Sequence, residues 1–294
     1  MEIRQLKTFQ TVAQLLSFNR AAQVLNYAQS TVSAQIKLLE QELGVSLFER
    51  LGKRITLTQE GQKLIRYARK MVDMEQETLT EMSRKEEPHG SISVRIPQTL
   101  STYRLPDILQ QFKTHYPKVS FNVSTCASYT LEQELKAGII DVAFLLADSI
   151  NALDLQSEVL AYEPLILVAD PNHPLATKPK VTVQDLQGES ILLPKHDCGY
   201  KMQFETMLSE RQVKAATITE LNSIEAVKQC VIRGIGITII PQIAVAKEIA
   251  HNQLTPLAWT DDTIESAVLM IQHKDKWISP VLKTFMDISR EVCK

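Results

Sequence analysis

Polar side chains able to hydrogen-bond with base edges and phosphates cluster near residue 30, and basic side chains follow around residue 53. Amide and hydroxyl groups read base edges in the major groove of DNA, whereas guanidinium and ammonium groups contact phosphates. The chemistry predicted for both groups is therefore the binding of duplex DNA. The predicted contacts are Gln29, Ser30, Thr31, Ser33, Gln35, Lys37, Arg50, Lys53 and Arg54.

Three predicted helices within residues 1–58 position these side chains. Apolar spacing between Leu6 and Leu16 predicts the first helix, and a short second helix carries Ala21 and Ala22 at a close helix crossing. The third helix begins at Gln29, and its inward positions are Val32, Ile36, Leu39 and Leu43. Two short helices joined closely predict a helix-turn-helix, whose second helix enters the major groove with its N-terminal half.

A β-hairpin is predicted after the third helix, because apolar residues alternate on both sides of the Leu51-Gly52-Lys53 turn. A basic hairpin beside a recognition helix is a wing that binds the phosphate backbone or the minor groove. Residues 1–70 carry 11 Lys and Arg against 5 Asp and Glu, which is +6, and the remaining residues carry 21 against 29, which is −8. The basic end favours a polyanionic partner. A plain three-helix bundle with a solvated basic loop is the alternative.

An ordered motif runs through this region and continues with Leu57-Thr58-x-x-Gly61. It is Ala21-Ala22-x-x-Leu25, then Gln29-Ser30-Thr31-Val32-Ser33-x-Gln35-Ile36-Lys37-x-Leu39-Glu40-x-Glu42-Leu43-Gly44-Val45-x-Leu47-Phe48-x-Arg50. The motif resembles the signature of LysR-type transcriptional regulators, and the length and layout of the whole chain fit that family. The resemblance implies a winged helix-turn-helix, a dimerising linker helix and a two-lobed effector domain like that of periplasmic binding proteins. Thr31 and Ala34 stand where the family often has Pro and Arg, which leaves the operator sequence open.

A long connecting helix is predicted within residues 59–89. Thr58 is a suitable N-cap, and no proline interrupts the chain from there to about Arg84. Leu64, Ala68, Met71, Glu75, Thr78 and Met82 recur at spacings of four and three, and Ile65, Val72 and Leu79 recur every seven residues. So much apolar surface favours a partner helix from a second chain, although packing on its own domain is the alternative. The segment Lys85–Gly90, which contains Pro88, is predicted to be a hinge.

Strands alternate with helices from residue 90 to residue 294, which predicts a mainly parallel α/β domain. We expect two lobes, with lobe I comprising about 90–161 and 266–294 and lobe II about 162–265. Ligands of such sheets bind beyond the carboxyl ends of the strands, often at helix N-termini. The residues predicted to bind an effector are Gln98, Thr99, Leu100, Ser101, Thr102, Thr125, Ser128, Cys198, Gly199, Tyr200, Asn222, Ser223 and Gly236.

Hydroxyl groups and backbone N–H groups at helix starts suit a carboxylate or another small oxyanion, so the predicted effector is a small anionic metabolite. Each Ser or Thr could instead be an N-cap that binds no ligand. The predicted mechanism is that effector binding changes the angle between the lobes and thereby moves the DNA-binding heads. The predicted partners are promoter DNA, the effector and further copies of the chain, as a dimer or tetramer, with RNA polymerase as a candidate.

Other function classes have weaker support in the sequence. A redox sensor using Cys198 is the main alternative, since a thiolate is stabilised near a helix N-terminus, but no cysteine lies between Cys198 and Cys230. No nucleotide-binding, nucleophile-elbow or zinc-protease motif is present, so we expect neither an enzyme nor a cofactor or metal. The N-terminus lacks the apolar core of a secretory signal, and no stretch approaches about 20 apolar residues. We therefore expect a cytoplasmic protein that does not enter a membrane.

Overall fold

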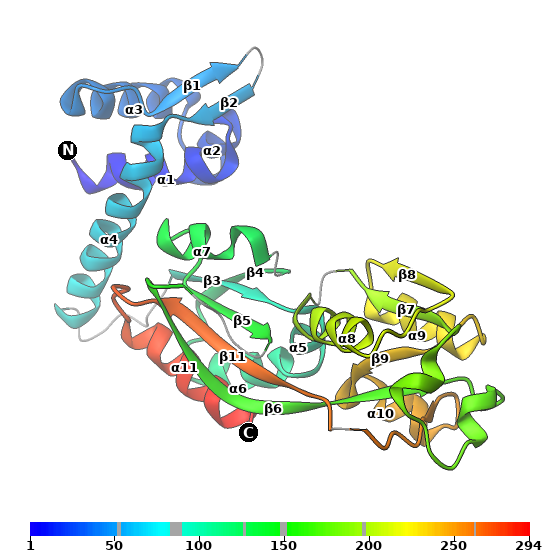
Figure 1. Cartoon of the computed structure of the whole chain (residues 1–294). Helices are drawn as coiled ribbons and strands as arrows, with labels where there is room; N and C mark the ends of the chain where they lie inside the picture. The colour runs from blue at the N-terminus through cyan, green and yellow to red at the C-terminus, as the bar shows by residue number, and fades with distance from the viewer. Residues whose placement is uncertain (52–53, 83–89, 126–127, 148–151, 196–197, 262) are drawn as a thin grey trace.

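The computed structural model describes residues 1–51, 54–82, 90–125, 128–147, 152–195, 198–261 and 263–294 (Figure 1). An N-terminal head is joined by one long helix to a larger α/β domain with two lobes (Figure 1). No helix in the described ranges is both long and apolar enough to cross a membrane.

The head contains three helices and an antiparallel hairpin, as the sequence predicts: α1 (Ile3–Leu15), α2 (Phe18–Leu25), α3 (Gln29–Leu43), β1 (Phe48–Leu51) and β2 (Arg54–Leu57). Ser17 caps α2 by accepting a hydrogen bond from the backbone N–H of Arg20 at 3.3 Å. Gly44, at φ +69°, ends α3 in a left-handed conformation that glycine adopts without strain. Phe9, Leu39 and their neighbours fill a separate core for the head. The turn residues Gly52 and Lys53 lie outside the described residues.

The connecting helix α4 (Gln59–Met82) has 24 residues and lies within the segment 59–89. Thr58 Oγ1 accepts a hydrogen bond from the backbone N–H of Gly61 at 3.0 Å, as an N-cap does. One face of α4 packs on the head, where Ala68 is fully buried and Ile65 and Val72 are partly buried. The predicted hinge, apart from Gly90, lies outside the described residues.

Lobe I is built on a sheet in which β3 pairs in parallel with β4 and β5. Its elements are β3 (Gly90–Ile96), α5 (Gln98–Tyr103), α6 (Leu105–His115), β4 (Val119–Thr125), α7 (Ser128–Lys136) and β5 (Val142–Leu146). The last strand, β11 (Glu265–His273), pairs with β5, and the last helix, α11 (Pro280–Val292), packs in the same core. Phe112, Phe144 and Phe285 pack together between the helices and the sheet.

Lobe II contains the parallel pair β7 (Ser190–Pro194) and β8 (Thr217–Leu221). Its helices are α8 (Cys198–Glu210), α9 (Ile224–Ile232) and α10 (Gln242–Ala250), with short 3-10 turns η1 (Pro174–Thr177) and η2 (Val183–Leu186). Two further strands, β9 (Thr238–Pro241) and β10 (Thr255–Pro256), pair antiparallel with the long strand β6 (Leu155–Ala169). A separate core around Val227 and Val245 joins α9 and α10 to this lobe.

The strand β6 (Leu155–Ala169) crosses both lobes, as Figure 1 shows. It pairs antiparallel with β11 in lobe I and with β9 and β10 in lobe II. The prediction of a mainly parallel domain is therefore wrong in this respect, because β6 and β11 make the sheets mixed. Residues 98–102, predicted to bind an effector, follow β3 and form most of the short helix α5.

Candidate nucleic-acid interface and inter-lobe site

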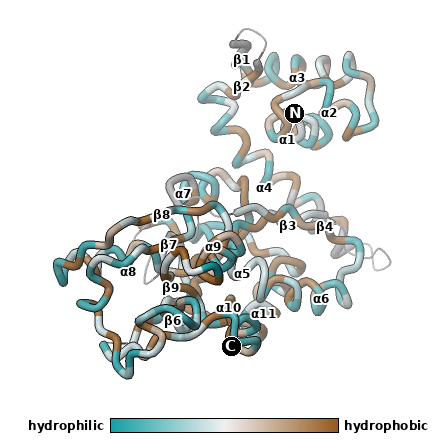
Figure 2. The backbone as a smooth tube through the Cα atoms, turned by 90° about the vertical axis from the view of Figure 1, so that its right-hand side faces the viewer, coloured by the Kyte–Doolittle hydropathy of each residue, from teal (hydrophilic) through white to brown (hydrophobic). Residues whose placement is uncertain are grey.

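The N-terminal half of α3 presents a polar face to solvent. Gln29, Ser30, Thr31 and Lys37 are exposed, and Ser33 is half-buried. Gln29 Nε2 donates a hydrogen bond to Ser33 Oγ at 2.8 Å, which aligns these two side chains along the helix. The first turn of α3 contains no acidic residue. In both views α3 and the hairpin lie on the side of the head that faces away from the α/β domain (Figures 1 and 2).

Gln35 lies inside the head, which corrects its expected place on the DNA-binding face. Gln35 is only 7% exposed, and its Oε1 accepts a hydrogen bond from Thr8 Oγ1 at 2.5 Å. Gln35 follows Val32 by three positions, so it shares the inward face of α3 rather than the outer one. It therefore joins α3 to α1. Arg50 and Arg54 lie on β1 and β2, and Lys53 lies outside the described residues.

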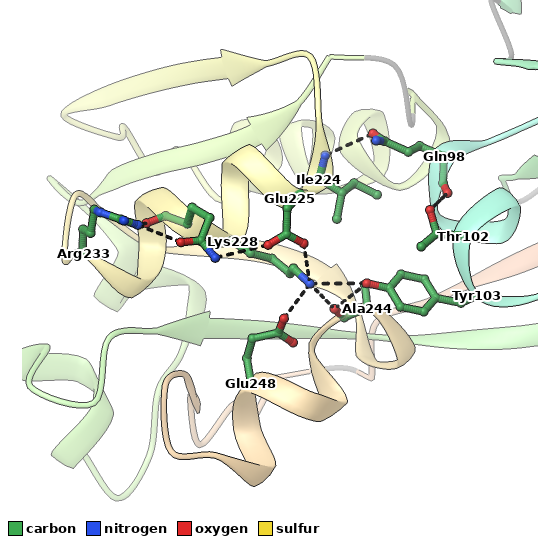
Figure 3. Close-up of polar contacts among 10 residues, drawn as sticks. Gln98, Thr102, Tyr103, Ile224, Glu225, Lys228, Arg233, Ala244 and Glu248 are labelled. Atoms are coloured by element: carbon green, nitrogen blue, oxygen red, sulfur yellow. Dashed lines mark hydrogen bonds and ion pairs between the residues drawn. The ribbon is translucent and has the colours of Figure 1, made fainter.

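Helix α5 of lobe I bonds directly to two helices of lobe II (Figure 3). Gln98 Oε1 accepts a hydrogen bond from the backbone N–H of Ile224, the first residue of α9, at 3.1 Å. Tyr103 OH donates to the backbone oxygen of Ala244 in α10 at 3.1 Å. The two ends of α5 thus hold the lobes together.

Lys228 of α9 is the centre of this contact (Figure 3). Its side chain is only 4% exposed, and its Nζ lies 2.6 Å from Glu248 Oε1 and 2.9 Å from Glu225 Oε2. It also donates to Tyr103 OH at 3.3 Å and to the Ala244 oxygen at 3.2 Å. Burial by itself lowers the pKa of Lys228, but the hydrogen bonds to Glu248, Glu225 and Tyr103 together raise that pKa above its ordinary value. The ammonium charge is therefore compensated within the cluster.

Several residues predicted to bind an effector do meet at the edge between the lobes. Gln98 reaches the start of α9, where Ser223 is the N-cap without a side-chain cap bond and Asn222 is exposed. Thr102 is exposed, and its Oγ1 donates to the Gln98 backbone oxygen at 2.9 Å. Four further predicted contacts lie in or at the ends of elements: Ser101 is half-buried in α5, Thr125 ends β4, Ser128 begins α7 and Cys198 begins α8.

Gly199 explains how closely the two lobes approach. A Cβ atom built on Gly199 would lie 1.6 Å from the backbone oxygen of Leu146, the last residue of β5. No other residue fits there without a shift of backbone. The start of α8 therefore packs directly on the carboxyl end of β5.

The other predicted effector contacts lie in the protein interior. Thr99, Leu100 and Tyr200 are buried, and the last two belong to the main hydrophobic core. A Cβ on Gly236 would lie 2.2 Å from the backbone oxygen of Ser190, at the opposite end of β7 from the inter-lobe edge. The close approach that Gly236 allows is therefore to a neighbouring strand, not to a ligand, and these four expectations are corrected.

Tyr103, Lys228 and Glu248 were not predicted from the sequence as site residues. One signal was available for Lys228, since it shares the inward stripe of α9 with Ile224, Val227 and Val231. A lysine on an otherwise apolar stripe must be paired when it is buried.

Comparisons with known proteins agree with this architecture. Residues 3–62 match the family described as "Bacterial regulatory helix-turn-helix protein, lysR family", and residues 85–294 match "LysR substrate binding domain". The chain is 37% identical to the uncharacterised HTH-type transcriptional regulator YwqM of Bacillus subtilis, covering all of both chains. It is 33% identical to the uncharacterised HTH-type transcriptional regulator YfiE of Escherichia coli, covering 99% of this chain and 98% of that one.

The chain belongs to the LysR family of transcriptional regulators.

Solved structures share the fold of this LysR-type regulator over its full length. A full-length OxyR variant from Pseudomonas aeruginosa superposes with a TM-score of 0.77 at 22% identity, covering 100% of this chain and 94% of that one. CbnR gives 0.63 at 22% identity and covers all of both chains. A Corynebacterium glutamicum OxyR mutant described as H2O2-bound gives 0.61 at 26% identity, covering 99% and 94%.

A crevice of about 1460 Å³ lies elsewhere in this LysR-type regulator, between the head, α4 and lobe I. It is lined by residues such as Gln10, Arg66, Arg69, Asp141 and Trp277, and none of the predicted effector contacts lines it. Among the residues that the structure describes, no group of three or more His, Cys, Asp or Glu side chains could hold a metal ion.

Proposed function

We propose that this LysR-type regulator binds promoter DNA by inserting the N-terminal half of α3 into the major groove. The supporting observation is the exposed polar face of α3 on a helix whose opposite face is fixed in the head core. Gln29, Ser30, Thr31 and Ser33 would read base edges, while Lys37 would contact phosphate. Arg50, Lys53 and Arg54 of the hairpin would bind the backbone beside it.

Gln29→Ala tests the base-reading role. Binding to the promoter fragment upstream of the regulator's own gene should weaken by about 1–3 kcal/mol, the usual discrimination carried by one bidentate base contact. Binding to a random fragment of the same length should change little. Gln14→Ala, on the exposed face of α1, is the matched control. Equal losses on both fragments in gel-shift titrations would refute base reading by Gln29.

Lys53→Ala tests the role of the hairpin. A phosphate contact carries no sequence information, so this substitution should weaken binding to both fragments alike and make binding less dependent on salt concentration.

The free face of α4 supports a homodimer. Tyr67, Met71 and Met74 recur at spacings of four and three, and Met74 is 64% exposed although it is apolar. This stripe lies beside the face that packs on the head, so α4 could contact its own head and a second copy through different faces. We assign the stripe to the same helix of a second copy, which would pair two heads on two half-sites. Met74→Glu should shift the wild-type assembly toward monomers in sedimentation experiments, whereas Glu60→Gln, on an exposed position of α4, should not.

We propose that a small anionic effector binds between the lobes, contacting Gln98, Ser101, Thr102, Thr125, Ser128, Cys198, Asn222 or Ser223. The support is that α5 and the start of α9 meet there and supply hydroxyl groups and helix N-termini. Binding would shift the population of lobe arrangements only if the effector prefers one of them. A thermal-shift screen of small carboxylates and phosphate esters on the full chain tests this, since a ligand of the native state raises the melting temperature.

The change in the arrangement of the lobes would alter the geometry of the bound promoter. Movement of the lobes would reposition the paired heads, change the bending of DNA and alter the recruitment of RNA polymerase. A dimer or a tetramer of the chain would carry out this step in the cytoplasm.

A redox function of Cys198 is the second candidate. The observation in its favour is that residue 198 is the first residue of the 13-residue helix α8, where a thiolate would be stabilised. A Corynebacterium glutamicum OxyR mutant of similar fold, described as H2O2-bound, supports testing this candidate. Mass spectrometry after mild peroxide treatment tests this candidate: an unmodified Cys198 excludes it.

A further inference from the structure

An ion pair joins the connecting helix to lobe I. Arg69 Nη2 of α4 lies 2.9 Å from both carboxylate oxygens of Asp141, which precedes β5. The two side chains are 20% and 10% exposed, so solvent and salt screen this pair less than a surface pair. A Cβ on Gly138 would lie only 3.4 Å from Arg69 Cδ, which places the stem of the arginine against the same loop.

Asp141 is fixed within lobe I by contacts that do not involve α4. The backbone N–H of Ser93 donates to Asp141 Oδ2 at 2.7 Å, and Lys276 Nζ lies 2.7 Å from Oδ1. The backbone N–H of Asp141 donates to the Ser93 oxygen at 2.8 Å. The carboxylate therefore keeps two partners when Arg69 is replaced, and the loss of Arg69 should not unfold lobe I.

Strand β5 leads from this ion pair to the edge between the lobes. It begins immediately after Asp141 and ends at Leu146, a span of about 17 Å at ~3.3 Å per residue. The backbone oxygen of Leu146 is where Gly199 of α8 packs without room for a side chain. One short strand therefore contacts the connecting helix at one end and α8 at the other.

We propose that Arg69 is a positioning residue that couples the orientation of the head to the arrangement of the lobes through Asp141 and β5. The crevice between the head and lobe I leaves space for the head to move, and the ion pair restricts that movement. This inference rests on the proposed DNA binding and names the contact through which the head would influence the arrangement of the lobes. Because coupling between two sites is reciprocal, DNA bound to the head must then alter the lobe interface.

Hydrogen–deuterium exchange on the full-length protein, with and without the promoter fragment upstream of its own gene, tests the coupling. In the wild type, DNA should change deuterium uptake in peptides covering β5 and residues 198–204. The change should be lost in Arg69→Gln and partly restored in Arg69→Lys, which keeps one charged contact. Arg66→Gln removes the same charge from an exposed position one turn earlier and should behave as the wild type.

The outcomes separate this inference from the proposed function. If the wild type fails to shift promoter DNA, the proposed function and the inference both fail. If the wild type binds DNA but β5 and α8 exchange unchanged, or if the change persists in Arg69→Gln, only the coupling is overturned. Equal melting temperatures of Arg69→Gln and Arg66→Gln would show that loss of the response is not loss of fold, whereas a selective fall for Arg69→Gln would assign Arg69 a structural role and overturn the inference.

Discussion

The polar face of α3 and the contact between the lobes use similar side chains in opposite ways. On α3, Gln29 and its neighbours point to solvent from a helix fixed by the head core. Between the lobes, Gln98, Tyr103 and Lys228 are bonded to the opposite lobe. The proposed DNA-binding face is thus arranged before its partner arrives, whereas the proposed ligand between the lobes would have to use or replace contacts that already exist.

Lys228→Met is the strongest test of that contrast. It leaves Glu248 partly buried with no ammonium partner, and breaking a buried pair in this way typically costs about 3–5 kcal/mol. We expect a fall in the free energy of unfolding near the lower end, because Glu225 is largely exposed. Urea denaturation of the full chain measures it. Lys247→Met, at an exposed position of α10, is the control. If both variants lose the same stability, the buried cluster contributes nothing beyond an exposed lysine.

Gln35→Ala, set beside Gln29→Ala, tests the same contrast within one helix. Gln35 is buried against Thr8, so its loss should destabilise the head by roughly 1–2 kcal/mol through an unsatisfied hydroxyl and a small cavity. Gln29→Ala should leave stability within about 0.5 kcal/mol, as exposed substitutions do. Urea denaturation followed by circular dichroism compares the two. Unchanged stability in Gln35→Ala, together with selective loss of operator binding, would return Gln35 to the DNA-binding face.

Gln35 and Lys228 are both buried polar residues, and the sequence carried the same signal for each. Val32, Gln35, Ile36 and Leu39 follow the i, i+3, i+4, i+7 spacing of one helix face, and so do Ile224, Val227, Lys228 and Val231. A polar residue on such a stripe is predicted to be buried with a partner. Its partner cannot be predicted from that spacing, because Thr8 and Glu248 lie on other helices.

The head was predicted almost element by element because local signals determine it. Apolar spacing acts within a few residues, as do the cap at Ser17 and the helix-ending glycine at position 44 that the structure shows. The α/β domain was predicted less completely, since β6 and β11 obtain their direction from partners more than 90 residues away in the chain. Leu100, Tyr200 and Gly236 were misplaced for the same reason: a position after a strand does not reveal which side chains face inward.

Acidification gives the smallest effect and isolates one charge of the inter-lobe cluster. The hydrogen bond from Lys228 lowers the pKa of Glu225 below its ordinary value. A carboxyl group with a lowered folded-state pKa stabilises the protein above its unfolded pKa of about 4.3, and that contribution is lost as pH falls through the folded-state pKa. Glu225 is 60% exposed, so we expect about 0.5 kcal/mol, as for other exposed pairs.

The measurement compares wild type with Glu225→Gln by urea denaturation at pH 7, 5 and 3. The glutamine can still accept a hydrogen bond from Lys228, so only the charge is removed. The difference in unfolding free energy should be full at pH 7 and should shrink as the pH falls below about 4, because wild-type Glu225 then becomes neutral as well. Glu291→Gln, at an exposed position of α11, controls for general charge effects. A difference that grows on acidification would mean that Glu225 destabilises the cluster, and Lys228 would then be held by Glu248 and Tyr103 without it.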